Sequence, residues 1–141
     1  MPSELVVQAV HQGGLKFAAT AGEHSVTLDY PFPSGHVAEG PTPLQMLLAS
    51  LAVCSGSTLA LVLSRAKQPV TGLEVQARGQ RSDTHPTVLT EISLEFVVRG
   101  TGVQSEAVQQ ALTVAEERLC PVWAMLKAST PIAVSFRLLE G

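Results

Sequence analysis

The segment that most constrains this chain is a long stretch without charge in its first half. From Gly40 to Ser64 there is no Asp, Glu, Lys, Arg or His, and Leu, Ala and Val predominate. A helix of this length and composition either crosses a bilayer or forms the interior of a compact domain. Several Ser and Thr residues, the central Gly56 and amphipathic segments on both sides favour the interior, because those segments need an apolar partner.

The two ends of this helix are marked in the sequence. Thr42-Pro43-Leu44-Gln45 combines an N-cap Thr, a Pro at the first helical position and a Gln three residues after the cap, which is the pattern of a capping box. The helix is expected to stop before Pro69, with Arg65 and Lys67 at its carboxyl end, where the helix dipole favours cations. The sequence therefore predicts one helix that begins at Pro43 and contains Cys54.

The remaining elements predict an α+β fold with antiparallel sheets around that long central helix, in a single domain over residues 1–141. Two further helices are expected at 105–119 and 121–127, because apolar residues in the first recur at helical spacing and Pro121 starts the second. Strands are expected on either side of the helices, at Glu4–Val10, Leu15–Thr20, Ser25–Tyr30, 73–78, 91–98 and 132–138.

Composition excludes several classes of function. Nine Lys and Arg against twelve Asp and Glu give a net charge of −3, so the chain has no basic surface for nucleic acid and no basic amphipathic segment for a membrane surface. No charged segment followed by an apolar run stands at the N-terminus, so we expect no signal peptide and a cytoplasmic location. In that reducing compartment the two cysteines are expected to be free, metal-binding or redox-active.

Cys54 and Cys120 are the candidate chemical groups. Cys54 lies deep in the apolar helix, beyond the first turn in which the helix dipole favours a thiolate, so on its own it would be an inert core thiol. It becomes reactive only if a hydrogen-bond donor or a cation reaches it from elsewhere. Cys120 precedes Pro121, which places it near the N-cap of a short helix, a position that lowers the pKa of a thiol. The alternative is a cysteine that only happens to precede a helix break.

The histidines and Gln45 give weaker evidence for a functional site. The four histidines lie at strand ends or in loops, without metal-ligand spacing to one another or to a cysteine, so we predict no metal site and no cofactor. Gln45 is a candidate substrate-binding residue, although it could equally serve only the capping box.

The sequence around both cysteines resembles the OsmC/Ohr family. The segment Gly40-Pro-Thr-Pro-Leu-Gln-Met-Leu-Leu-Ala-Ser-Leu-Ala-Val-Cys54-Ser is similar to the family's central helix, which carries its first, reactive cysteine. Cys120-Pro-Val, between a helix and a closing strand, is similar to the second-cysteine motif. Leu-Gln-Met after Pro43 looks most like the YhfA-type OsmC-like branch.

The resemblance implies an intertwined homodimer that acts as a thiol-dependent peroxidase in the oxidative or osmotic stress response. Cys54 would attack an organic hydroperoxide and become a sulfenic acid, Cys120 would resolve it as a disulfide, and an external dithiol would reduce the pair. Peroxidases of the family carry a Glu ten residues before the reactive Cys and an Arg in the N-terminal strands. Here Leu44 takes the first position and no Arg precedes Arg65. The alternative is therefore a non-catalytic dimer that binds an apolar ligand or senses thiol oxidation.

Overall fold

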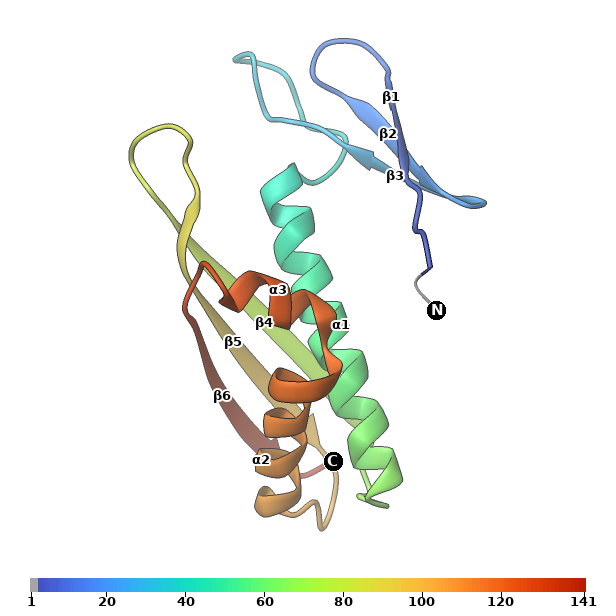
Figure 1. The fold of residues 1–141 in the computed structure, drawn as a ribbon, viewed down its shortest axis with the longest axis vertical. Helices are drawn as coiled ribbons and strands as arrows, with labels where there is room; N and C mark the ends of the chain where they lie inside the picture. The colour runs from blue at the N-terminus through green and yellow to red at the C-terminus, as the bar shows by residue number, and fades with distance from the viewer. Residues whose placement is uncertain (1–2) are drawn as a thin grey trace. The chain divides into compact units, whose positions relative to one another are not determined.

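The computed structural model describes residues 3–141 (Figure 1). The chain forms two compact units, Met1–Leu47 and Leu48–Gly141. The elements follow in the order β1 (Gln8–His11), β2 (Phe17–Ala21), β3 (His24–Leu28), α1 (Pro43–Arg65), β4 (Gly72–Arg81), β5 (Leu89–Arg99), α2 (Ser105–Val114), a π-helical turn η1 (Ala115–Leu119), α3 (Pro121–Lys127) and β6 (Ile132–Leu139).

The first unit contains a three-stranded antiparallel sheet in the order β1-β2-β3. Gly13 and Gly14 both have positive φ between β1 and β2, a conformation that glycine adopts without steric cost. The three expected strands are confirmed, but β1 begins at Gln8 and not at Glu4, because it pairs with β2 only from Gln8 onward.

Helix α1 begins and ends as its sequence predicts. The Thr42 backbone N–H donates to Gln45 Oε1 at 2.9 Å, and the Gln45 N–H donates to Thr42 Oγ1 at 3.3 Å, which completes the capping box. At the other end Lys67 adopts the left-handed conformation, with a φ of 56°. Its N–H donates to the Ser64 carbonyl and the next N–H donates to the Leu63 carbonyl, so the last carbonyls of the helix are satisfied.

The sheet of the second unit corrects the expectation of antiparallel sheets. β4 and β5 form the expected antiparallel hairpin, but β6 pairs with β5 in parallel, in the order β4-β5-β6. The residues between β5 and β6 form α2, η1 and α3, and a connection through helices returns the chain to the same end of the sheet. The sheet is therefore mixed.

One face of this sheet is covered by helices (Figure 1). The side chains at every second position of β5, from Ile92 to Val98, are buried on this face and form one core cluster with residues of α1, α2 and α3. Gly56 allows α1 to approach β4, because a Cβ at this position would lie 2.9 Å from Val75 Cγ2. The buried core consists of Leu51, Leu59, Leu63, Ile92, Leu94, Phe96, Val98, Val108, Ala111, Leu112, Ala115, Cys120 and Trp123.

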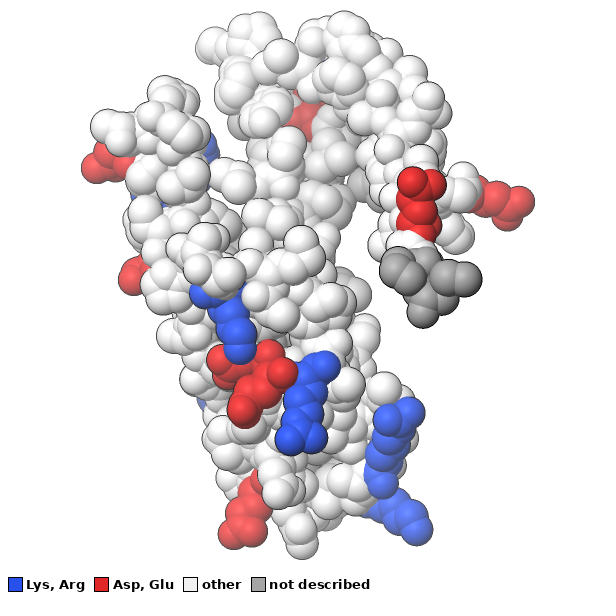
Figure 2. Space-filling view, in the orientation of Figure 1, with Lys and Arg blue, Asp and Glu red and all other residues white. Residues whose placement is uncertain are grey.

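The opposite side of α1 is exposed and apolar. Val53 is 67% exposed and Leu61 is 46% exposed. Arg65 is the one charged residue of α1, so the other Lys, Arg, Asp and Glu side chains coloured in Figure 2 belong to other segments. Within residues 3–141, α1 is the one helix whose length and composition would suffice to cross a membrane, and core helices of water-soluble domains share these properties. Its other face packs on the sheet, as a core helix does.

Candidate redox site

Cys120 is held at the junction of two helical segments. The helix predicted over 105–119 is present, but its last turn is π-helical, and the Cys120 N–H donates to the Ala115 carbonyl at 2.9 Å. Pi-helical turns are rare and are often found at functional sites. Cys120 then caps α3, and its Sγ accepts a hydrogen bond from the Trp123 backbone N–H at 3.5 Å. The predicted N-cap position is therefore confirmed, and the side chain is only 2% exposed.

Cys54 lies on the partly buried side of α1. Its side chain is half-buried and packs against the core of the second unit. Its carbonyl accepts a hydrogen bond from Thr58 Oγ1 at 2.8 Å, one turn further along the helix. Cys54 is thus more accessible to solvent than Cys120.

The fold brings the two cysteines together although they are 66 positions apart in the chain. Both are free thiols, and Cys54 packs against the core cluster that contains Cys120. This pairing could not be read from the sequence, because it depends on how α1 and α3 pack against the same face of the sheet.

The protonation of Cys120 differs from the prediction. Burial raises the pKa of the Cys120 thiol to about 11, and the neighbouring Cys54 side chain adds to that increase. The backbone N–H groups of Trp123 and Val122 act in the opposite direction, as expected for an N-cap, but they are outweighed. The expectation of a lowered pKa for Cys120 is therefore wrong, because the loss of solvation outweighs the capping hydrogen bonds.

An accessible thiol beside a buried, protonated one is an arrangement suited to thiol oxidation chemistry. In thiol oxidation an accessible sulfur meets the oxidant, and a nearby thiol condenses with the oxidised product. Within the described residues no group of three or more His, Cys, Asp or Glu side chains could hold a metal ion.

Gln45 occupies the capping box of α1 and is exposed. The side-chain oxygen that could bind a substrate is the atom that accepts the Thr42 N–H. A role for Gln45 in substrate binding stays a prediction.

A polar cluster in the first unit was missed by sequence analysis. Asp29, which directly follows β3, is 1% exposed. Its carboxylate accepts hydrogen bonds from the backbone N–H groups of Tyr30 (2.8 Å) and Glu39 (3.1 Å), and it pairs with His36 Nε2 at 2.9 Å. The hydrogen bond to His36 lowers the pKa of Asp29, and the two backbone hydrogen bonds act in the same direction. These hydrogen bonds hold the loop before α1 in place. The sequence feature that could have indicated the cluster is an Asp at the end of a strand with apolar residues.

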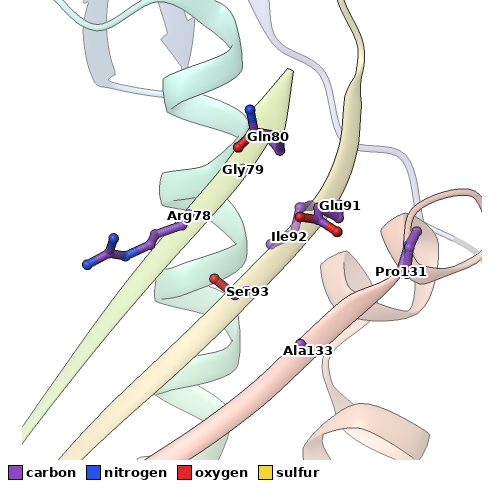
Figure 3. Close-up of a pocket in the computed structure, with 8 residues that line it drawn as sticks. All are labelled: Arg78, Gly79, Gln80, Glu91, Ile92, Ser93, Pro131 and Ala133. Carbon is purple, nitrogen blue, oxygen red and sulfur yellow. The ribbon is translucent and has the colours of Figure 1, made fainter. Parts of the chain in front are cut away.

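The polar face of the second sheet is hollowed into a pocket of about 330 Å³ at one end of β4, β5 and β6 (Figure 3). Arg78 and Ser93 are register partners on this face, whereas Ile92 faces the core. The Arg78 guanidinium donates to Gln76 Oε1. Neither cysteine lines this pocket, so it is separate from the redox site. The lining residues are Arg78, Gly79, Gln80, Glu91, Ile92, Ser93, Pro131 and Ala133.

Comparison with known proteins agrees with this fold. The family model described as OsmC-like protein matches residues 35–135, a range that includes both Cys54 and Cys120. The chain belongs to the OsmC-like family.

The chain is similar in sequence or in structure to several individual proteins. Protein YhfA of Escherichia coli (strain K12) is 30% identical over 129 residues, which cover 91% of this chain and 93% of YhfA. A hypothetical protein from Aquifex aeolicus VF5 has a similar structure, with a TM-score of 0.89, 25% identity and coverage of 99% of both chains. The fold is also shared with an organic hydroperoxide resistance protein from Elizabethkingia anophelis, with a TM-score of 0.69 and 20% identity over 96% of this chain and 98% of that one.

Proposed function

We propose that this protein is a thiol-dependent peroxidase that reduces organic hydroperoxides, with Cys54 as the attacking thiolate and Cys120 as the resolving thiol. The observation that carries the proposal is the pair of free thiols in one core, an accessible Cys54 near a buried Cys120 whose pKa it helps to raise. An organic hydroperoxide resistance protein has the same fold, which is consistent with this chemistry.

The reaction proceeds in three balanced steps. The Cys54 thiolate attacks the terminal peroxide oxygen, the O–O bond breaks, and the alkoxide leaves and takes up a proton to become an alcohol. The Cys120 thiolate then attacks the sulfur of the Cys54 sulfenic acid, and the hydroxide that leaves becomes water on protonation. An external dithiol reduces the resulting disulfide and is itself oxidised to a disulfide.

The protein works as a homodimer in this proposal. Val53 and Leu61 expose apolar side chains on the uncharged face of α1, and monomeric soluble proteins rarely leave such a surface in water. A second copy of the chain would remove this face from solvent. The proposal places the dimer in the cytoplasm, in the oxidative or osmotic stress response, where dithiol reductants keep thiols reduced.

A second candidate function is a non-catalytic dimer that binds an apolar ligand or senses thiol oxidation. The observation in its favour is Leu44, which replaces the Glu of the family's peroxidases, together with the lack of any Arg before Arg65. A sensor would still form the disulfide, but it would not turn over.

The test is turnover of cumene hydroperoxide with a small dithiol as reductant. The parent is compared with Cys54→Ser and Cys120→Ser, and the uncatalysed reaction of the dithiol is subtracted. Steady turnover that Cys54→Ser abolishes supports the peroxidase. A single oxidation of the parent without turnover supports the sensor, and no reaction above the dithiol alone contradicts the peroxidase.

A further inference from the structure

We propose that the first unit contains a binding site for a small organic ammonium ion, in a pocket of about 270 Å³ beside the Asp29–His36 pair. Every residue that lines this pocket belongs to the first unit, and neither cysteine is among them. The ligand class is a primary amine with a small apolar body. The site goes beyond the proposed peroxidase function and does not depend on it.

The pocket is lined by two backbone segments that are both held in place. One is the turn between β1 and β2, where the Gln12 N–H donates to the Lys16 carbonyl at 2.9 Å and the Lys16 N–H donates to the Gly13 carbonyl at 3.0 Å. The other is the loop after β3, which packs closely on that strand, because a Cβ at Gly40 would overlap the Thr27 carbonyl oxygen. Walls of this kind form the pocket before a ligand arrives.

One hydrogen-bond network brings four ionisable side chains to this pocket. The Oδ2 atom of the buried Asp29 accepts hydrogen bonds from His36 Nε2 at 2.9 Å and from the Glu39 backbone N–H at 3.1 Å. The Glu39 carboxylate in turn pairs with Lys16 Nζ at 3.0 Å. All four residues line the pocket, so the network fixes their positions around it.

Two hydrogen-bond acceptors of this network are free. Asp29 is ionised at neutral pH because its pKa is lowered, and a carboxylate only accepts, so His36 Nε2 carries the hydrogen of the neutral imidazole. His36 Nδ1 then presents a lone pair and has no partner within residues 3–141. Glu39 binds Lys16 through Oε2, which leaves its Oε1 atom without a partner among the same residues. A ligand with N–H donors would satisfy both atoms.

The charge of the pocket favours a cation over an anion. Asp29 and Glu39 each carry one negative charge, and Lys16 carries one positive charge. With a neutral His36 the net charge of the lining residues is therefore −1. Phe32 is exposed and also lines the pocket, and an aromatic ring attracts a nearby cation and contacts its apolar body. These features together define an organic ammonium ion as the ligand.

The test is titration of the reduced protein with benzylamine at about pH 8, where a typical imidazole is neutral. In proton–nitrogen correlation spectra the amide signals of Gly13 and Gly14 follow occupation of the pocket. The Nδ1 signal of His36 follows hydrogen bonding to the imidazole. Benzyl alcohol and benzoate serve as the neutral and the anionic probe of similar size.

Two variants change the charge of the pocket in opposite directions. Glu39→Gln removes a negative charge and keeps the size of the side chain, and Lys16→Met removes the positive charge and keeps an unbranched chain. Glu23→Gln is the matched control, because it makes the same change in net charge at an exposed position between β2 and β3 of the same unit.

We expect saturable binding of benzylamine with a dissociation constant of about 1 mM. Glu39→Gln should raise this constant about threefold and Lys16→Met should lower it about threefold, the size of effect typical of partly exposed charges. Glu23→Gln should match the parent. Damage to the fold would weaken binding, so tighter binding by Lys16→Met cannot result from such damage.

The absence of a saturable shift at about ten times that benzylamine concentration would overturn the inference. Binding of benzyl alcohol or benzoate as tight as that of benzylamine would also overturn it, because the pocket would then not select an ammonium ion. The same holds for an unchanged dissociation constant in Glu39→Gln. These titrations use neither peroxide nor oxidised protein, so their outcome is separate from that of the peroxidase test.

Discussion

Oxidation of the Cys54–Cys120 pair should stabilise the second unit substantially. The two cysteines are separated by 66 positions, so a disulfide between them closes a long loop in the unfolded chain. The loss of loop entropy for a loop of this size corresponds to about 4 kcal/mol at 25 °C. Both cysteines already pack in the same core in the folded state, so we expect little native strain to offset that gain.

The assay is urea unfolding of the reduced protein and of protein oxidised with one equivalent of cumene hydroperoxide. The intrachain disulfide is verified by the loss of two hydrogen atoms in the mass of the whole chain. Trp123, the one Trp of the sequence, lies in the core and three residues after Cys120, so its fluorescence reports the transition. Because the cross-linked unfolded chain is more compact, the dependence of the unfolding free energy on urea should also decrease.

Cys54→Ser and Cys120→Ser provide the controls, because neither can form the intrachain bond. Treatment with hydroperoxide should leave the unfolding midpoint of each near that of its untreated form. A parent protein that forms the disulfide but unfolds at the same or a lower urea concentration would refute the reasoning. Such a result would mean that α1 and α3 have to be displaced from their positions in the reduced protein to form the bond, and that this displacement strains the native state.

Three further predictions concern packing, pH and assembly. Gly56→Ala should lower the free energy of unfolding in urea by about 1 kcal/mol, because the clash of the new Cβ with Val75 outweighs the gain in helix propensity. A variant more stable than the parent would contradict this prediction and show that the Val75 side chain moves aside without loss of stability. The lowered pKa of Asp29 means that its carboxylate stabilises the fold above its usual pKa of 3.8. That contribution is lost as the pH falls through the lower folded-state value, so thermal unfolding below about pH 4 should be less pH-dependent in Asp29→Asn. Val53→Asp should convert the proposed dimer to a monomer in light scattering, whereas a monomeric parent would contradict the dimer.

Much of the fold could be predicted from local signals. The capping box of Thr42 and Gln45 fixed the start of α1, and Pro121 fixed the start of α3, because each depends on neighbouring residues alone. The order of strands and helices also followed from periodicity. The parallel pairing of β6 did not, because strand direction in a sheet depends on the path of the helical connection and leaves no mark in a single strand.

The candidate site could likewise be predicted only in part from the sequence. The sequence by itself singled out Cys54 and Cys120 as the candidate chemical groups, and it placed Cys54 inside an uncharged helix and Cys120 at an N-cap. Only the tertiary structure decided that the two thiols share one core and that burial raises the pKa of Cys120. Local sequence sets backbone conformation and capping, whereas the pKa of a thiol depends on solvation and on partners that packing brings from distant parts of the chain.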